Sequence, residues 1–331
     1  MTIQQLLKTA PITTLLLVSF IGLFIMQVLS GVDANNPSTE ALLKWGANAL
    51  PYTMDNEPWR LASSAFLHIG LMHLLFNGFA MYFFGQIAEP MFGSAKFLAL
   101  FLLAAIGGNL LNNYVTWQSL LDGTGQPGLS AGASGGIMGI GAALLIAALF
   151  KISVNGMVLN LKSLIIIMGI NLVYGFAVPG IDNAGHIGGA VTGLVVALAY
   201  AIAYRQRLAI TLQNIPSTAQ DIYRTTYINS PVNSATDFSL PTSTHAPRFD
   251  NEGNFDNNSS FNHDSAVNSP LNSHANHASL NHGKVNEQQT TKSTLIWQLL
   301  PWLVMLLISI SFIWWWQDIH QQILQVLAAI E

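Results

Sequence analysis

Seven long stretches of the sequence contain no Asp, Glu, Lys or Arg, and this feature limits the possible folds more than any other. The stretches cover residues 12–30, 61–88, 97–121, 123–150, 163–181, 183–204 and 295–316. A helix needs about 20 mainly apolar residues to cross a bilayer, because the hydrocarbon core is about 30 Å thick. Strands of a transmembrane barrel would be shorter and would alternate in polarity. The pattern therefore predicts an all-α, polytopic (multi-pass) membrane protein with one transmembrane helix in each stretch.

The composition supports a membrane protein and excludes several functional classes. Charged residues make up 8% of the 331 residues, against about 25% in a typical soluble domain. The net charge of −4 gives no basic footprint for nucleic acid. The chain contains no cysteine, which excludes disulfides, thiolate metal ligands and a cysteine nucleophile.

The basic residues beside the stretches predict sidedness, since Lys and Arg are enriched in cytoplasmic loops. With a cytosolic N-terminus most of them lie inside, namely Lys8, Lys96, Lys151, Lys162, Arg205 and Arg207. Only Lys44 and Arg60 then lie outside. The first stretch also has features of a signal peptide, but its 19 residues exceed the usual 7–15 apolar residues, so we expect a retained anchor.

Composition along the chain predicts three blocks. Residues 1–204 hold six helices, and residues 295–331 hold a seventh helix and a short outer tail, with Trp297, Trp302 and Trp314 to Trp316 as interfacial anchors. Residues 205–294 are rich in Asn, Ser and Thr and predict a disordered cytosolic linker. Its His274-x-x-His277 pair is compatible with metal binding, but no cysteine or acidic ligand stands at ligand spacing. We therefore favour a solvated tail and predict no metal and no cofactor.

Ser134 stands among glycines, in Gly132-Ala133-Ser134-Gly135-Gly136, and precedes an apolar helix. Glycines on both sides allow close backbone approach and expose the hydroxyl. The same spacing also fits a glycine motif for close helix packing, so this segment alone leaves both interpretations open.

His186 is a candidate partner for Ser134 and stands at the start of the sixth predicted helix. Gly189 and Gly193 follow it at i+3 and i+7, on the same helix face. A glycine face allows tight contact with a neighbouring helix. The helices of Ser134 and His186 start on the same side of the membrane, so the two side chains can meet. A serine hydroxyl needs a positioned base to become a nucleophile, and histidine suits that role near neutral pH.

The second charge-free stretch supplies His73 and Asn77 at i and i+4, on one helix face. Together with the backbone N–H of Ser134, they are candidate hydrogen-bond donors to an oxyanion. Loss of one such donor typically lowers the rate by about 10²–10³-fold. The alternative is hydrogen bonding between helices without chemistry. His68, placed in the same helix, lies off this face and is interpreted as structural.

Together these motifs resemble the rhomboid family of intramembrane serine proteases. The match consists of His68-x₄-His73-x₃-Asn77, Gly132-x-Ser134-Gly135 and His186-x₂-Gly189-x₃-Gly193, with Trp59-Arg60 and Gly85-x₃-Glu89-x₃-Gly93 as structural motifs. It covers residues 40–204. One position departs from the family pattern, because Met138 stands where an aromatic residue commonly packs against the base histidine.

The resemblance implies a six-helix rhomboid-like bundle with one added C-terminal helix, a 6+1 arrangement. It implies a dyad of Ser134 as nucleophile and His186 as general base, with Asp182 better explained as a helix-start acid than as a third member. It also implies Phe76 as a gate residue, single-span membrane proteins as substrates, contact with membrane lipid, and a location in a bacterial cytoplasmic membrane. The alternatives are an inactive relative that binds client membrane proteins and a small-solute transporter, and the oligomeric state stays open.

Overall fold

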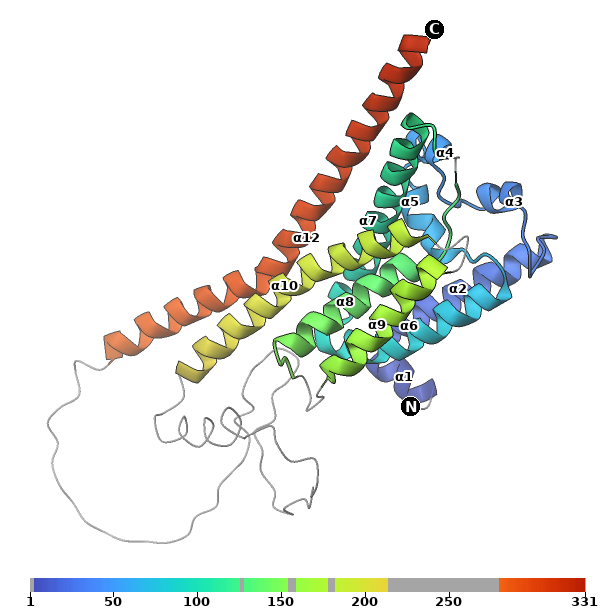
Figure 1. Ribbon diagram of the computed structural model, residues 1–331. Helices are drawn as coiled ribbons and strands as arrows, with labels where there is room; N and C mark the ends of the chain where they lie inside the picture. The colour runs from blue at the N-terminus through green and yellow to red at the C-terminus, as the bar shows by residue number, and fades with distance from the viewer. Residues whose placement is uncertain (1–2, 126–127, 154–158, 178–181, 214–279, 331) are drawn as a thin grey trace, which may run out of the picture. The chain divides into compact units, whose positions relative to one another are not determined.

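The computed structural model describes residues 3–125, 128–153, 159–177, 182–213 and 280–330 (Figure 1). The long helices are α2 (Pro11–Leu29), α6 (Leu71–Phe92), α7 (Ser94–Leu121), α8 (Ser134–Leu149), α9 (Leu161–Ala177), α10 (Asn183–Gln213) and α12 (Leu280–Ile330). The short ones are α1 (Ile3–Thr9), α3 (Thr39–Lys44), α4 (Leu50–Met54), α5 (Arg60–Ser63) and the 3₁₀ turn η1 (Ser64–Phe66). One isolated antiparallel bridge joins Asn48 to Ser130. The all-α class is confirmed for these residues.

Two compact units divide the chain, one formed by Met1–Ala209 with Ser293–Glu331 and the other by Ile210–Lys292. Most of the expected linker, with His274 and His277, lies outside the described residues. Helix α10 continues to Gln213 and α12 begins at Leu280, so both helices include residues that the sequence assigned to the linker. All contacts of the site described below lie within the first unit.

Each of the seven charge-free stretches overlaps one long helix, in chain order. Five helices within the described residues are long and apolar enough to cross a membrane, namely α2, α6, α7, α10 and the Leu295–Ile330 part of α12. The remaining two, α8 and α9, have 16 and 17 residues, fewer than the usual span of about 20. The protein is thus an integral multi-pass membrane protein, and the number of crossings stays a prediction.

The second stretch differs from its prediction, because residues 61–70 do not belong to the transmembrane helix. They form α5, η1 and a turn at Gly70, whose φ of +90° favours glycine, and α6 begins only at Leu71. The prediction that placed His68 in this helix is therefore wrong. A charge-free loop that packs into the bundle has the same composition as a helix, so composition could not separate the two.

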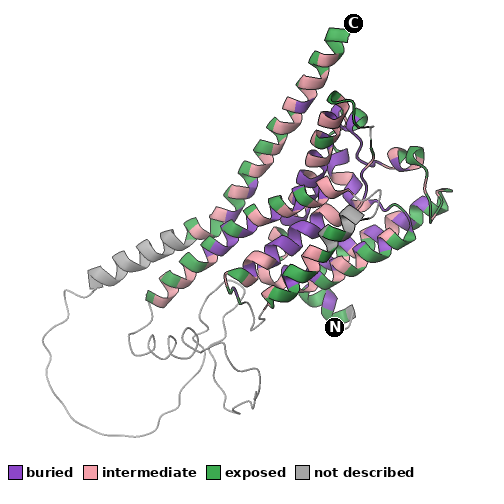
Figure 2. Ribbon diagram, in the orientation of Figure 1, coloured by how far each residue is buried: buried purple, intermediate pink, exposed green. Residues whose placement is uncertain are grey.

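The core of the first unit lies between α2, α6, α7, α8 and α10. Helix α8 is the most enclosed, since every residue from Gly136 to Leu144 is buried (Figure 2). By contrast, large apolar side chains such as Phe79 and Leu303 are exposed on α6 and α12. This outward apolar surface is what lipid contact requires. The serine helix is therefore held by protein on most sides.

Buried polar residues of the predicted structural motifs hold the ends of the helices. The Glu89 carboxylate, on α6, accepts hydrogen bonds from Ile12 N–H and from the N–H and hydroxyl of Thr13, all of α2. The Arg60 guanidinium donates to Leu43 O at 2.7 Å and Ala47 O at 3.0 Å, and lies over the rings of Tyr52 and Trp59. These contacts fix α2 against α6 and fold the long connection before α6.

The C-terminal half of α12 packs on α4 and α7. Ile319 is fully buried in a cluster with residues of these two helices. Trp316 Nε1–H donates to Thr53 O at 3.0 Å, and Trp117 Nε1–H donates to Gln322 Oε1 at 3.1 Å. Trp314 is 67% exposed, as an interfacial anchor would be, whereas Trp316 makes a contact within the protein. The interfacial-anchor role of the exposed tryptophans stays a prediction.

Candidate active site

Ser134 is the first residue of α8 and is half-buried. The helical hydrogen bonds of α8 begin with Ile137 N–H, which donates to Ala133 O at 3.0 Å. The N–H groups of Ser134, Gly135 and Gly136 precede this bond and have no acceptor within the helix. Ser134 thus stands at the positive end of a helix dipole, where backbone donors are available to a developing negative charge.

The segment before Ser134 is held by Gly132. Its N–H donates to Ser64 O at 2.9 Å, and its φ of +148° is rarely adopted by other residues. A Cβ at this position would lie 2.6 Å from Cε1 and 2.9 Å from Nε2 of His73. The imidazole of His73 therefore lies directly against the backbone two residues before Ser134.

Hydrogen bonds fix the tautomer of neutral His73. Its Nδ1 accepts from Ile69 N–H at 3.2 Å, so the ring proton must reside on Nε2. This nitrogen is then a donor on the side of Gly132. Asn77 is buried, and its amide donates to His73 O at 2.9 Å within α6. One of its two N–H bonds is thereby used by its own helix, and one remains for another acceptor.

Helices α8 and α10 touch backbone to backbone through glycines. A Cβ on Gly189 would lie 2.7 Å from the carbonyl carbon of Gly135, and one on Gly193 would lie 2.5 Å from Cα of Gly139. The predicted glycine face is thus where the helices meet.

The contact extends to the start of both helices. A Cβ on Gly135 would lie 3.3 Å from Gly185 O. Gly135 follows Ser134 and Gly185 precedes His186, so the structure brings the starts of the two helices together. No hydrogen bond joins Ser134 to His186 within the described residues. His186 Nδ1 is buried and has no hydrogen-bond partner there either.

Among the described residues, the Asp182 carboxylate is hydrogen-bonded to groups other than the His186 ring. Its Oδ1 accepts from Gly185 N–H at 2.7 Å and Asn112 Nδ2 at 2.9 Å, and its Oδ2 accepts from Ser130 Oγ at 2.7 Å. The carboxylate therefore caps α10, as expected of a helix-start acid. A third member of a catalytic triad would instead accept from the base histidine.

Three further predicted residues take different positions. His68 is fully enclosed, its ring centroid 5.1 Å from that of Phe20 and 5.5 Å from that of His73, which fits a structural role. Burial lowers the pKa of His68 to about 3, so it is neutral at physiological pH. Phe76 is 65% exposed on α6, and Met138 is buried in α8 one turn after Ser134. The roles of these two stay predictions.

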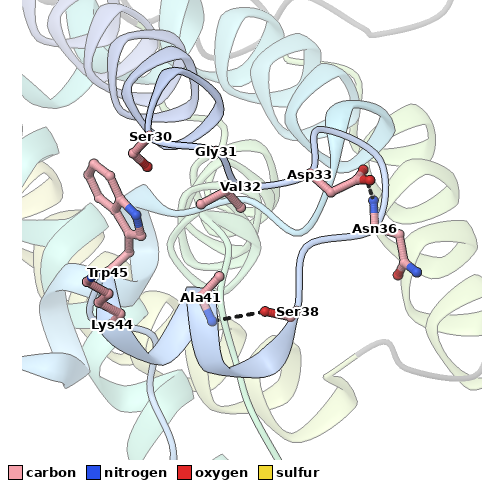
Figure 3. A pocket seen from close by; sticks show the side chains of 9 residues that line it. All are labelled: Ser30, Gly31, Val32, Asp33, Asn36, Ser38, Ala41, Lys44 and Trp45. Carbon is pink, nitrogen blue, oxygen red and sulfur yellow. Dashed lines mark hydrogen bonds between the residues drawn. The ribbon is translucent and has the colours of Figure 1, made fainter.

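A pocket of about 640 Å³ lies elsewhere, between the end of α2 and helix α3 (Figure 3). Its lining comes from Ser30, Gly31, Val32, Asp33, Asn36, Ser38, Ala41, Lys44 and Trp45. None of the predicted site residues is among them, so this pocket is distinct from the start of α8 and α10.

Similarity to known proteins agrees with this geometry. Residues 55–203 match the family model of the Rhomboid domain. The chain is 38% identical over 181 residues to Rhomboid protease GluP of Bacillus subtilis (strain 168), which covers 54% of this chain and 34% of GluP. It is 30% identical over 210 residues to Rhomboid protease AarA of Providencia stuartii, which covers 59% of this chain and 74% of AarA.

Plant relatives match a similar share of the chain. RHOMBOID-like protein 6, mitochondrial, of Arabidopsis thaliana is 33% identical over 159 residues, covering 47% of this chain and 48% of that protein. The chain thus spans about a third of GluP and three quarters of AarA. The matched region contains the serine, histidine and glycine motifs described above, and the chain belongs to the rhomboid family.

Proposed function

We propose that this protein is an intramembrane serine endopeptidase that cleaves single-span membrane proteins in or near their transmembrane helix. The observation that carries the proposal is the backbone contact of Gly135 with Gly185, which are the chain neighbours of Ser134 and His186. The names of GluP and AarA, both rhomboid proteases, support the same activity.

The proposed chemistry is acyl transfer by a Ser134–His186 dyad. His186 takes the proton from Ser134 Oγ, and the oxygen attacks the scissile carbonyl carbon. His186 then gives this proton to the leaving amine as the peptide C–N bond breaks. A water molecule, deprotonated by His186, attacks the acyl-enzyme, and His186 returns the proton to Ser134 Oγ as the acyl C–O bond breaks. The unpaired Nδ1 of His186 supports a dyad, because no carboxylate among the described residues accepts a bond from it.

The oxyanion of the tetrahedral intermediate would be held by donors from two helices. The free N–H groups at the start of α8 supply backbone donors, and His73 Nε2–H and the second N–H of Asn77 supply side-chain donors from α6. The contact of His73 with Gly132 supports this arrangement, because it places the imidazole beside the serine segment. Such donors are effective because they are oriented before the charge develops.

The topology, the lipid contacts and the route of substrate entry are part of the same proposal. We expect a 6+1 topology with a cytosolic N-terminus, so that the start of α8 and α10 lies near the outer surface, where water is available. Lipid surrounds the exposed apolar faces. Substrate would enter from the membrane past α6, whose exposed Phe76 is a candidate gate.

Cleavage by purified protein in proteoliposomes tests the proposal. The substrate is a single-span reporter carrying a different tag at each end, and the products are identified by mass spectrometry. Wild type and the control Ser311→Ala, an exposed serine on α12, should cut the reporter at one region. Ser134→Ala and His186→Ala should reduce cleavage to background.

Two results would overturn the protease assignment. Cleavage that persists in Ser134→Ala would show that another group is the nucleophile. A folded wild type that binds the reporter without cutting it would favour the alternative, a rhomboid-like protein that binds client membrane proteins.

A further inference from the structure

The glycine contact between α8 and α10 sets how close the helices approach, but it cannot by itself set their position along the axes. Glycine surfaces carry no side chains that interlock, so one helix can shift along the other at little cost in contact area. A shift by a single residue moves a side chain by about 1.5 Å. Misplacement of reacting groups by about 1 Å can cost about 10²-fold in rate. Some other contact must therefore fix Ser134 relative to His186.

Asp182 contacts both the His186 helix and the segment that leads into the Ser134 helix. Its backbone carbonyl accepts from His186 N–H at 3.0 Å, which makes it part of the first turn of α10. Its carboxylate accepts from Ser130 Oγ at 2.7 Å, four residues before Ser134. One residue thus joins the serine segment to the backbone of the base histidine.

The Ser130 side of this link is rigid. Ser130 N–H donates to Asn48 O at 2.8 Å, and Asn48 N–H donates to Ser130 O at 2.9 Å. Asn48 is in turn joined by its side chain to Asn113 of α7, at 3.2 and 3.0 Å. Because Ser130 is tied to α7 in this way, it cannot follow a shift of α10 without breaking the bond to Asp182.

We propose that Asp182 is a positioning residue that, through its hydrogen bond to Ser130, fixes the axial register of the His186 helix against the Ser134 helix. Asp182 acts through these contacts and does not touch the reacting atoms. The inference rests on the proposed protease function for its kinetic consequences, and on the geometry alone for its structural ones.

Substitutions separate a positioning role from a catalytic one. Asp182→Asn keeps an acceptor for Gly185 N–H, and its amide can donate to Ser130 Oγ, whose own proton then turns to Asn109 Oδ1, at 3.2 Å. Asp182→Ala and Ser130→Ala both remove the link. We expect kcat to fall by about 10- to 100-fold in each alanine variant, with KM unchanged, and to stay close to wild type in Asp182→Asn.

The double variant and a matched control sharpen the kinetic test. Asp182→Ala with Ser130→Ala should be no slower than the slower single variant, because both remove the same contact. Asp33→Ala is the control, since the Asp33 carboxylate also accepts hydrogen bonds from backbone N–H groups but has no contact with Ser130, and the kcat of this variant should not change. An Asp182→Asn variant as slow as Asp182→Ala would overturn the proposal in favour of a catalytic carboxylate.

A distance measurement tests the geometry without any activity. The chain has no cysteine, so spin labels at Leu149→Cys and Val191→Cys are unique. Leu149 ends α8 and Val191 lies near the start of α10, both exposed, so an axial shift changes their separation directly. Double electron–electron resonance should show a shifted or broadened distance in Asp182→Ala and the wild-type distance in Asp182→Asn. An unchanged distribution in Asp182→Ala would contradict the proposal, even if the wild type proved inactive.

Discussion

The two contacts that bring α8 and α10 together differ in kind. Along the helices the contact is made by Gly135, Gly139, Gly189 and Gly193, with backbone against backbone and no side chain between them. Just before their starts, the segments that lead into the two helices are joined by a hydrogen bond between polar side chains, from Ser130 to Asp182. The glycines permit proximity, whereas hydrogen bonds are directional and select one arrangement. A membrane protein needs the second kind of contact for precision, because lipid is as apolar as the helix faces.

The largest effect should follow from breaking the glycine contact with Gly189→Ala. The added methyl group would lie 2.7 Å from the carbonyl carbon of Gly135, and backbone cannot move aside as a flexible side chain can. We expect cleavage at background and a loss of about 1–3 kcal/mol in the free energy of unfolding. Thermal unfolding and reporter cleavage measure both.

Gly22→Ala is the control for this prediction. Gly22 lies on α2 with no atom within 4 Å of its expected Cβ, so the variant should be as stable as wild type or more so. A Gly189→Ala protein that is as active as the Gly22→Ala protein would show that the close contact is not needed.

Gly132→Ala should have the next largest effect, since Gly132 lies between Ser130, which makes the polar contact, and Gly135, which makes the glycine contact. A methyl group there would displace the His73 ring, and the backbone conformation would be strained. Removal of one oxyanion donor typically lowers kcat by about 10²–10³. Gly128→Ala, in the same segment but with open space around it, should leave kcat unchanged. Equal kcat values for the two variants would remove His73 from the proposed oxyanion site.

Asn48→Ala tests the polar side of the comparison and should lower the free energy of unfolding. It leaves the Asn113 amide buried without its two bonds to Asn48, a loss of about 1–3 kcal/mol. Thermal unfolding should show this loss, and Asn113→Ala should add little to it, because the two residues share these bonds. Fully additive losses would mean that the pair does not act as a unit.

The smallest effect is expected for Trp316→Phe at the contact of α12 with α4. The change keeps an aromatic ring but removes the N–H that donates to Thr53 O, a loss of about 0.5–1.5 kcal/mol. Trp314→Phe, at an exposed position, should lose less. Thermal unfolding in the same detergent compares the stability of the two variants. A greater loss of stability for Trp314→Phe would show that the Trp316 hydrogen bond is not the contact that holds the seventh helix.

Local sequence patterns predicted the parts of the site that depend on neighbours in the chain. The glycines at i+3 and i+7 from His186 predicted the helix face that meets a neighbouring helix, and the glycines around Ser134 predicted close backbone approach at that segment. A close contact at Gly132 was predictable from the local sequence as well, because a glycine before a candidate nucleophile allows another group to approach the backbone closely.

Contacts between distant segments were not predictable from one sequence. Asp182 and Ser130 are 52 residues apart, and Thr53 and Trp316 are 263 residues apart, so no periodicity connects them. Charge-free composition also failed at residues 61–70, where a buried loop ends in the positive φ of Gly70. Hydrophobic patterning therefore located the helices, whereas the hydrogen bonds that position the site could be identified only from the structure.

Labelling with a fluorophosphonate probe tests the central claim, an activated Ser134, most directly. Protein in native membranes is labelled, digested and analysed by mass spectrometry, which assigns the modified residue. We expect the probe to modify a single serine, Ser134. The labelling should be lost in Ser134→Ala and in His186→Ala, and retained in Ser311→Ala. Labelling that survives in His186→Ala, or folded wild type that is not labelled at Ser134, would contradict this claim.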